Sequence, residues 1–444
     1  MSTPSFARLG SANTYDNART NLMSRQTALS NLQEHLTSGK RVNTASDDPT
    51  AAAQAERALT RINRIQADQR ALDAQKNSIT QAESTLGDVN DVMQRFRELV
   101  VSAGSGVHTM AERVIISAEL QGLRDQVFAL SNRKDTNGQP LFGALASALT
   151  PFVGPQATAP DYTFKGLPGQ TASSEVAIPF TLDGDSAFMH QPARDHVFNA
   201  SVSNTTDLLI SSDRTLVTDN VDMVNSATVS ATATAAAAVA PPNNVPYPKY
   251  TLTFGVVTPD PINPLTGPST TSYTIVENPA VSGALTPVPI PVTFTPGKST
   301  SITVTQVPGL KFTITGTPKA NDTVTIDAQP SIFSVLDDAI LNIGGASNNT
   351  AAAQAVSQAL HNIDIGMSRV SSVRGQAGDL LNRADRISDN QVKRSIQLED
   401  DRSRAEDLDM IKGISDFQNQ QTGYQAALQS YAQVQKLSLF NYIS

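Results

Sequence analysis

PTAAAQAERALTRINRIQADQRALDAQKNSITQAESTLGDVNDVMQRFRELVV, residues 49 to 101, carries an apolar residue at every seventh position: Ala58, Ile65, Leu72, Ile79, Leu86, Met93 and Val100. A second apolar set lies three residues after the later members: Ala82, Val89 and Phe96. Spacings of three and four place both sets on one side of an α-helix. No proline interrupts residues 50–101, and Gly87 is their only glycine. A helix of about 50 residues is roughly 75 Å long, so we predict a rod that buries its stripe against other helices.

The start signal of this helix is Ser46-Asp47-Asp48-Pro49. Asp48 can accept hydrogen bonds from the free amides of the first turn, and Pro49 suits the first helical position. Two adjacent carboxylates can also serve general acid–base catalysis. Because a helix cap accounts for Asp48 and a solvated loop for Asp47, we expect no catalytic role.

Two further helices are predicted in the N-terminal part of the chain. The first should end at Ser38, because Gly39 can adopt the left-handed conformation of a helix C-terminus. Its stripe consists of Tyr15, Ala18, Leu22, Leu29, Leu32 and Leu36. The other covers about residues 110–132 and stops in the turn Asn132-Arg-Lys-Asp-Thr-Asn-Gly138.

Residues 144–330 have a different composition, rich in Pro, Thr, Gly and Val, and their apolar period is two. This pattern predicts short antiparallel strands around Tyr250–Phe254, Tyr273–Ile275, Val292–Phe294, Ile302–Val304, Phe312–Ile314 and Val324–Ile326. An Ala/Thr run with prolines at about 227–248 is expected to link two β lobes or to form a long surface loop.

The helical period returns at Ser331. A short helix should end near Gly344-Gly345, and a second long rod follows, with a weak seam at 388–404. The rod's stripe contains Val356, Leu360, Ile363, Met367, Val370, Ala377, Leu381 and Ala384, and later Leu408, Ile411, Ile414, Phe417, Tyr424, Leu428, Tyr431, Val434 and Leu437.

The two ends of the chain therefore carry matching stripes, which predicts an α+β fold. Both chain ends form a long antiparallel helical coiled-coil rod, and an antiparallel β domain is inserted at its tip. We expect a terminal helical assembly region, a helical rod domain and the β insertion, formed by residues 1–48 with 405–444, 49–143 with 331–404, and 144–330.

Two arginines, Arg25 and Arg374, occupy positions within the apolar seams. Each either extends its charge into water or pairs with a carboxylate on a neighbouring helix or subunit. The terminal stripes leave a similar choice open. They can pair within one chain as an ordinary core, or between chains to build a polymer.

Composition and motifs exclude several classes of function. The net charge is −8 without a basic cluster, which argues against nucleic acid, and no apolar run reaches the length of a membrane span. The chain has no cysteine and no HExxH, P-loop, GxSxG or GxGxxG motif. His190 and His196 flank Asp195, but no third ligand stands at a useful spacing, so we expect a solvated loop there. We expect no cofactor, metal or catalytic residue.

Several motifs resemble those of the flagellin superfamily. Leu36-Thr-Ser-Gly-Lys-Arg-Val-Asn43 with Ser46-Asp-Asp-Pro49 resembles its N-terminal signature, in the form typical of the hook–filament junction proteins, the third flagellar hook-associated proteins. Further matching motifs are Leu141-Phe-Gly143, Val373-Arg-Gly375 with Leu381-Asn382, and Leu437-Ser-Leu-Phe-Asn-Tyr-Ile443. The Leu-Leu-Arg ending typical of flagellins is missing.

The resemblance implies a secreted structural subunit without enzymatic activity. It would be exported unfolded through the flagellar type III channel and would join the hook to the filament, outside the cell. Implied partners are the first hook-associated protein, flagellin, an export chaperone on the C-terminal helix, and further copies in a ring or helical layer. The alternatives are a flagellin-type filament subunit, or an adhesin or enzyme whose active part is the β lobes and whose helices form only a supporting stalk.

The mechanism expected from the stripes is coupled folding and assembly. Terminal helices that are mobile alone would become ordered when they bury their apolar residues against neighbouring subunits. The expected interface residues are Tyr15, Leu22, Leu29, Leu32, Leu36, Phe417, Tyr424, Leu428, Tyr431, Leu437 and Phe440.

Overall fold

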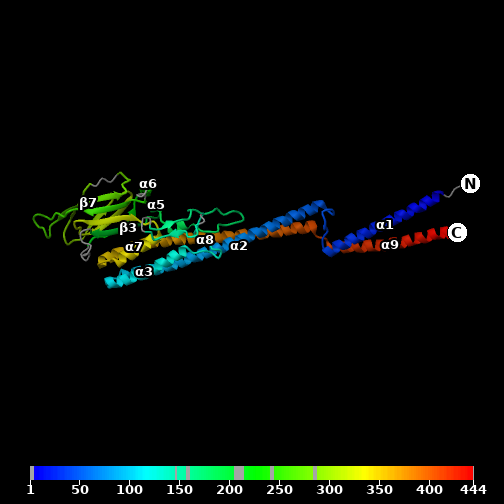
Figure 1. The fold of residues 1–444 in the computed structure, drawn as a ribbon, viewed down its shortest axis with the longest axis horizontal. Coiled ribbons are helices and arrows are strands. Elements are labelled where there is room, and N and C mark those ends of the chain that lie inside the picture. Colours follow the sequence, from blue (N-terminus) through cyan, green and yellow to red (C-terminus); the bar gives the residue numbers. More distant parts are fainter. Residues whose placement is uncertain are drawn as a thin grey trace. The chain divides into compact units, whose positions relative to one another are not determined.

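The computed structural model describes residues 5–145, 148–156, 161–204, 215–240, 245–283 and 288–443. The predicted α+β fold is confirmed: long helices come from both chain ends, and an antiparallel β insertion lies between them in sequence (Figure 1). The chain divides into two compact units, which we call the terminal unit (residues 1–71 and 386–444) and the central unit (residues 72–385). Within the described residues, no helix combines the length and apolar character that a membrane span requires.

Two long helices contribute to both units. They are α2 (Pro49–Ala103) and α8 (Asn349–Glu406). The predicted helix over residues 49–101 is therefore confirmed almost to the residue. Its stripe is buried as expected, and Ile79, Leu86 and Phe96 are completely inaccessible.

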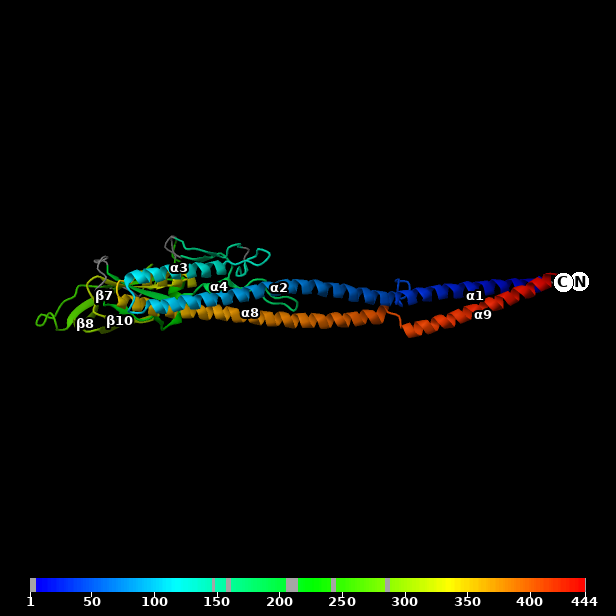
Figure 2. The same cartoon turned by 90° about the horizontal axis from the view of Figure 1, so that it is seen from below.

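The terminal unit contains two more helices, which lie side by side in both views (Figures 1 and 2): α1 (Ser5–Ser38) and α9 (Met410–Ile443). Helix α1 ends at Ser38 because Gly39 has a φ of +73°. It begins ten residues before the predicted stripe. The second rod is not continuous, contrary to expectation. It breaks at residues 407–409, where the Asp409 carboxylate accepts hydrogen bonds from the first free amides of α9.

The central unit contains α3 (Met110–Ser131) and α7 (Ile332–Gly344), which pack against each other. Thr109 and Glu112 form a reciprocal capping box at the start of α3. At the exposed edge between α2 and α8, Arg374 Nε donates a hydrogen bond of 2.7 Å to Glu83 Oε1. The ion-pair interpretation of Arg374 is thereby confirmed.

The β insertion contains two main sheets, whose strands pair antiparallel. The five-stranded sheet has the order β3 (Phe198–Asn204), β11 (Asp322–Ala328), β6 (Lys249–Phe254), β7 (Ser269–Asn278), β8 (Ile290–Phe294). In the four-stranded sheet, β10 (Leu310–Gly316) pairs with β4 (Val217–Thr218), β5 (Asp222–Met223) and β9 (Thr300–Val304). A small ribbon, β1 (Phe152–Val153) with β2 (Thr163–Phe164), and two short helices, α4 (Gly184–Phe188) and α5 (Pro192–Asp195), precede them.

The expectation of a linker or long surface loop at 227–248 is wrong for the first half of this range. Residues Ser226–Ala237 form helix α6, whose start is capped by the Asn225 side chain. Val229 of this helix is fully buried, in one apolar cluster with residues of both sheets. A helix of small residues fits here because Ala and Thr at every third or fourth position can approach the sheets closely. The two sheets and α6 thus share one core.

Polar contacts attach the insertion to α8. Gln354 and Gln358 donate hydrogen bonds to Thr218 Oγ1, and Asn362 donates to the carbonyl of Phe198, 3.0 Å away. Arg369 donates to Asp195 Oδ1 at 2.9 Å. Because these amide side chains are buried, each contact satisfies a group that would otherwise be costly to remove from water.

Candidate assembly surface on the terminal helices

The predicted stripe of α1 is only half covered in the single chain. Leu22, Leu29, Leu32 and Leu36 are all half-buried, and none of the side chains described in α1 is fully buried. The close contact with α9 occurs at Gly413, where a Cβ atom would lie 3.2 Å from Leu36 Cδ2. Arg25 lies against Gly423 in the same way. The antiparallel pair therefore leaves part of its apolar surface open.

Helix α9 carries apolar residues that differ in exposure. Phe417, Tyr424 and Tyr431 follow Gly413 at helical spacing and are half-buried on the side of α1. From the edge of this side outwards, Leu428, Ile414 and Ile411 are 43%, 47% and 85% exposed. Leu428 and Tyr431, which a rotation of about 60° around the helix axis separates, thus differ in exposure.

The side chains of Tyr15, Leu437 and Phe440 lie outside the described residues, although all three positions belong to the backbone of α1 or α9.

The loop between α1 and α2, residues 39–48, is held by two carboxylates. Asp48 accepts hydrogen bonds from the amides of Thr50 and Ala51 and from the Thr50 hydroxyl. Asp47 instead accepts from the amides of Asn43 and Thr44, 3.0 and 2.9 Å away, so it does more than occupy a solvated loop. Ser46 shares a hydrogen bond with the Thr44 hydroxyl, and Pro49 is the first residue of α2.

Both carboxylates are stabilised in their charged form. Hydrogen bonds, first from the Ala51 amide and then from the Thr50 hydroxyl, lower the pKa of Asp48 to about 2. The pKa of Asp47 is lowered chiefly by the Thr44 amide. Permanently charged, hydrogen-bonded carboxylates suit a structural role and not proton transfer near neutral pH.

The same loop is joined to the break between α8 and α9. The Arg41 amide donates to the Glu406 carbonyl at 2.7 Å, and the Leu408 amide donates to the Gly39 carbonyl at 3.0 Å. Lys40 also forms an ion pair with Glu406. These contacts fix where the chain leaves the α2/α8 pair and enters the α1/α9 pair.

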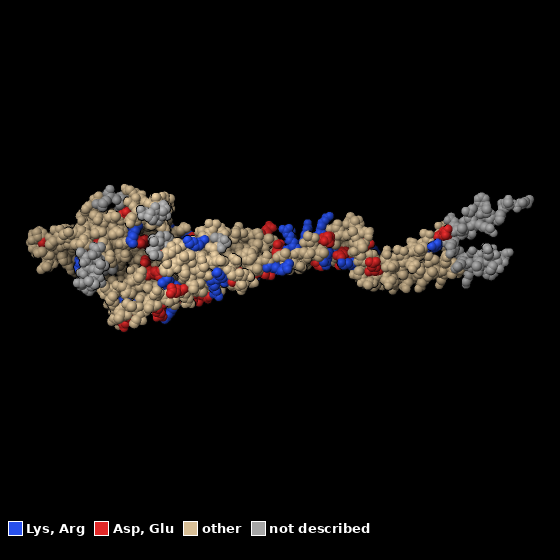
Figure 3. All heavy atoms as spheres, viewed as in Figure 1, with Lys and Arg blue, Asp and Glu red and all other residues tan. Residues whose placement is uncertain are grey.

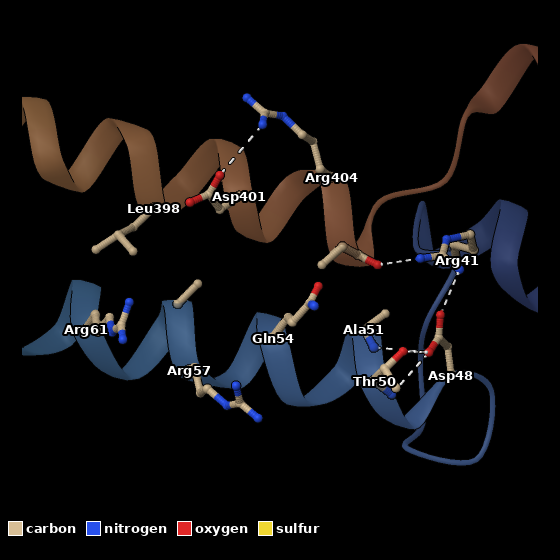
Figure 4. A pocket seen from close by; sticks show the side chains of 12 residues that line it. Arg41, Asp48, Thr50, Ala51, Gln54, Arg57, Arg61, Leu398, Asp401 and Arg404 are labelled. Carbon is tan, nitrogen blue, oxygen red and sulfur yellow. Dashed lines mark hydrogen bonds and ion pairs between the residues drawn. The ribbon is translucent and has the colours of Figure 1, made fainter.

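Beside this junction, α2 and α8 enclose an open groove of about 540 Å³ (Figure 4). We call it the arginine groove, because Arg41, Arg57, Arg61 and Arg404 line it, together with Asp48, Asp401 and small residues such as Ala51 and Ala58. Figure 3 shows basic side chains gathered over this part of the terminal unit. Sequence analysis missed the groove, although Arg57 and Arg61, four residues apart, share one helix side.

Of the two histidines in the insertion, His196 is exposed as expected, whereas His190 is not. His190 is buried, and burial lowers its pKa to about 4. Asp195 forms ion pairs with two arginines, Arg194 and Arg369. Among the residues that the structure describes, no group of three or more potential ligands is arranged to hold a metal ion.

Comparisons with known proteins assign the helical ends to one family. The model of the bacterial flagellin N-terminal helical region matches residues 11–146, and that of the bacterial flagellin C-terminal helical region matches residues 360–443. Both matches lie outside most of the β insertion.

Two relatives and one solved structure illustrate the likeness. Flagellar hook-associated protein 3 of Salmonella typhimurium is 33% identical over 151 residues, 33% of this chain and 46% of that protein. Flagellin 1 of Proteus mirabilis is 32% identical over 136 residues, 30% of this chain and 37% of that protein. The chain thus spans less than half the length of these curated relatives. The crystal structure of the flagellar junction protein FlgL from Legionella pneumophila has the same fold, with a TM-score of 0.53 at 22% identity over 74% of this chain and 98% of that one.

Proposed function

The chain belongs to the flagellin superfamily, and from this premise we propose that it is the structural subunit that joins the flagellar hook to the flagellin filament. The observation that carries the proposal is the open apolar face of α9, formed by Ile411, Ile414 and Leu428. An exposed apolar face on a helix is typical of a surface that another protein covers. The half-covered stripe of α1 lies on the same helix pair.

Three observations favour a junction protein over a filament subunit. The Ser46-Asp47-Asp48-Pro49 motif resembles the junction form of the superfamily signature. The fold of this chain matches that of a flagellar junction protein over 98% of that protein's length. A relative named hook-associated protein 3 aligns with a third of this chain.

The proposed mechanism is assembly through the terminal helices after unfolded export. Burial of an exposed apolar side chain contributes about 1.5–3 kcal/mol, so a few such residues on α1 and α9 are enough to hold a subunit in place. The proposed neighbours are the first hook-associated protein, flagellin and further copies of this chain, and the proposed place is the hook–filament junction outside the cell. An export chaperone is proposed to cover α9 before secretion.

The test is the double variant Ile411→Asp with Leu428→Asp. Both side chains are exposed in the single chain, so the purified variant should keep its helical circular dichroism. In an assembled interface, two buried carboxylates without partners would cost several kcal/mol. Cells that carry the variant should build hooks, release flagellin into the medium and fail to swim.

The matched control is the double variant Asn419→Asp with Ser430→Asp, which adds the same two charges to α9. Both residues are exposed, and their helical positions point away from the α1 side and from the apolar face. The control should leave motility unchanged.

Secretion of each variant must be measured separately, since the chaperone is proposed to cover the same helix. Normal filaments in cells that secrete Ile411→Asp with Leu428→Asp would overturn the proposal. Loss of filaments without release of flagellin would favour the filament-subunit alternative.

A further inference from the structure

The arginine groove holds more positive charge than its own residues neutralise. Arg41 pairs with Asp48 at 3.3 Å, and Arg404 lies 3.7 Å from Asp401. Arg57 and Arg61 form neither a hydrogen bond nor an ion pair with any described residue, and Figure 4 shows both without a partner. The groove therefore presents two uncompensated guanidinium groups on one wall.

The bottom of the groove is shaped to admit another chain. Ala51, Ala58 and Ala405 have short side chains, and they leave the space between the α2 and α8 backbones open. Guanidinium groups on the rim bind carboxylates with two parallel hydrogen bonds. An acidic side chain that enters from solvent could thus meet Arg57 or Arg61 above an apolar base.

The chain itself supplies the complementary charge. The central unit, residues 72–385, has 27 acidic and 17 basic side chains, whereas the terminal unit has 14 acidic and 16 basic ones. The molecule's negative charge is therefore concentrated in the unit that does not carry the groove. Electrostatic complementarity of this kind aligns partners and increases their association rate.

We propose that the arginine groove receives carboxylate side chains from the central unit of a second copy of this chain. The inference rests on the proposed function, because it assumes that copies pack side by side in an assembly. The groove also adjoins the proposed assembly surface, since Arg41 and Ala405 belong to the junction with α1 and α9. Such a contact joins two different surfaces, so it is heterologous and can build a ring or a helical layer.

The direct test places a photo-crosslinking amino acid, p-benzoylphenylalanine, at Gln54, which is exposed and lines the groove. Flagella from cells that carry this variant are irradiated, and crosslinked peptides are identified by mass spectrometry. A covalent dimer with adducts on residues 72–385 of the second copy is expected. Mixing isotope-labelled with unlabelled copies identifies links between chains. Adducts only on other proteins or on the terminal unit, or none at all, would overturn the inference.

Charge variants test the chemistry of the contact. Arg57→Glu and Arg61→Glu should each lower the yield of dimer by roughly tenfold, because reversal converts attraction into repulsion. Arg61→Lys, which keeps the charge but loses the two parallel hydrogen bonds, should give a yield between those of the parent and of Arg61→Glu. The matched control is Arg70→Glu, an exposed position on α2 outside the groove. An equal loss in Arg70→Glu would show that general charge, and not the groove, is responsible.

The two proposals can fail separately. If the parent chain is absent from purified flagella, the proposed junction function fails. The same irradiation is then carried out on concentrated purified protein at low and high salt, and a dimer that weakens with salt and with Arg61→Glu supports the groove contact. If the chain is present in flagella and the Gln54 variant gives no dimer, only the groove inference fails.

Discussion

Single side chains set the points where the helical backbone changes direction. Asp48 satisfies the free amides at the start of α2, and Asp409 does the same for α9. Ahead of Asp48 in the chain, Gly39 supplies the left-handed turn that ends α1. In the central unit, Asp195 joins the insertion to α8 through Arg369. Each of these residues acts on the backbone or on a neighbouring charge, and none needs a reacting group.

The cap at Asp48 should give the terminal unit a defined dependence on pH. The folded-state pKa is about 2, below the ordinary value of 3.8, so the charged form is favoured by folding. Its contribution to stability is complete above the unfolded pKa and is lost as the pH falls towards 2. Asp48→Ala should lower the midpoint of thermal unfolding of the terminal unit at neutral pH.

Two variants check this assignment. Asp48→Asn should keep most of the neutral-pH stability, since Asn is also a good cap, but it should remove this part of the acid dependence. Asp400→Asn, at an exposed position without a hydrogen bond to any described residue, should change neither. The measurement is circular dichroism during heating at several pH values. The cap account fails if Asp48→Ala and Asp400→Asn unfold alike.

The composition of helix α6 gives no indication in the sequence that this segment is a buried helix. Ser226–Ala237 is built from Ser, Thr, Ala and one Val, and such a run lacks both large apolar residues and a clear periodic stripe. Only its position against two sheets makes Val229 and Ala236 core residues. The burial of α6 is therefore a tertiary effect, which local pattern cannot reveal.

The neighbouring positions Val229 and Ser230 allow a direct test of this packing. Val229 is buried in the shared core, whereas Ser230 is exposed. Val229→Asp should bury a carboxylate without a partner and lower the free energy of unfolding of the insertion by several kcal/mol. Ser230→Asp should change it by less than about 0.5 kcal/mol. Denaturant unfolding followed by the β signal measures both. Similar stability of the two variants would mean that α6 is not part of the core.

Elements with a periodic apolar pattern, in contrast to α6, were predictable from the sequence. The stripe of α2 recurs at every seventh residue along most of the helix, and the alternation Tyr250, Leu252, Phe254 marks β6 with equal clarity. The candidate site was predictable only in part. Leu22 and Tyr424 are half-buried members of the α1/α9 pair. The arginine groove, in contrast, needs α2 and α8 to meet, and the pairing of Leu398 with Ile62 and Ile65 becomes visible only in three dimensions.

At the scale of the whole molecule, apolar burial is distributed very unevenly. The part of α2 within the central unit has buried residues in every turn from Leu72 to Val100. Among the described side chains of α1, none is buried, and in the described part of α9 only Gly413 is buried. Terminal helices that lack buried anchors gain most of their stability from a partner, which is the physical basis of coupled folding and assembly.

This distribution predicts a gradient of local stability in the free protein. Backbone amides of α1 and α9 should exchange with solvent much faster than those of α2 between Leu72 and Ala103, because local opening of the terminal pair exposes little buried apolar surface. Hydrogen exchange with mass spectrometry on dilute protein measures the difference. Trypsin should cut first at Arg19, Arg25 and Lys412, while the same sites in purified flagella should be protected. If α1 and α9 exchange as slowly as the core of α2 in the free chain, their stripes are already a complete intramolecular core. Assembly through the terminal helices would then not be coupled to their folding, and the junction would have to be held by other surfaces.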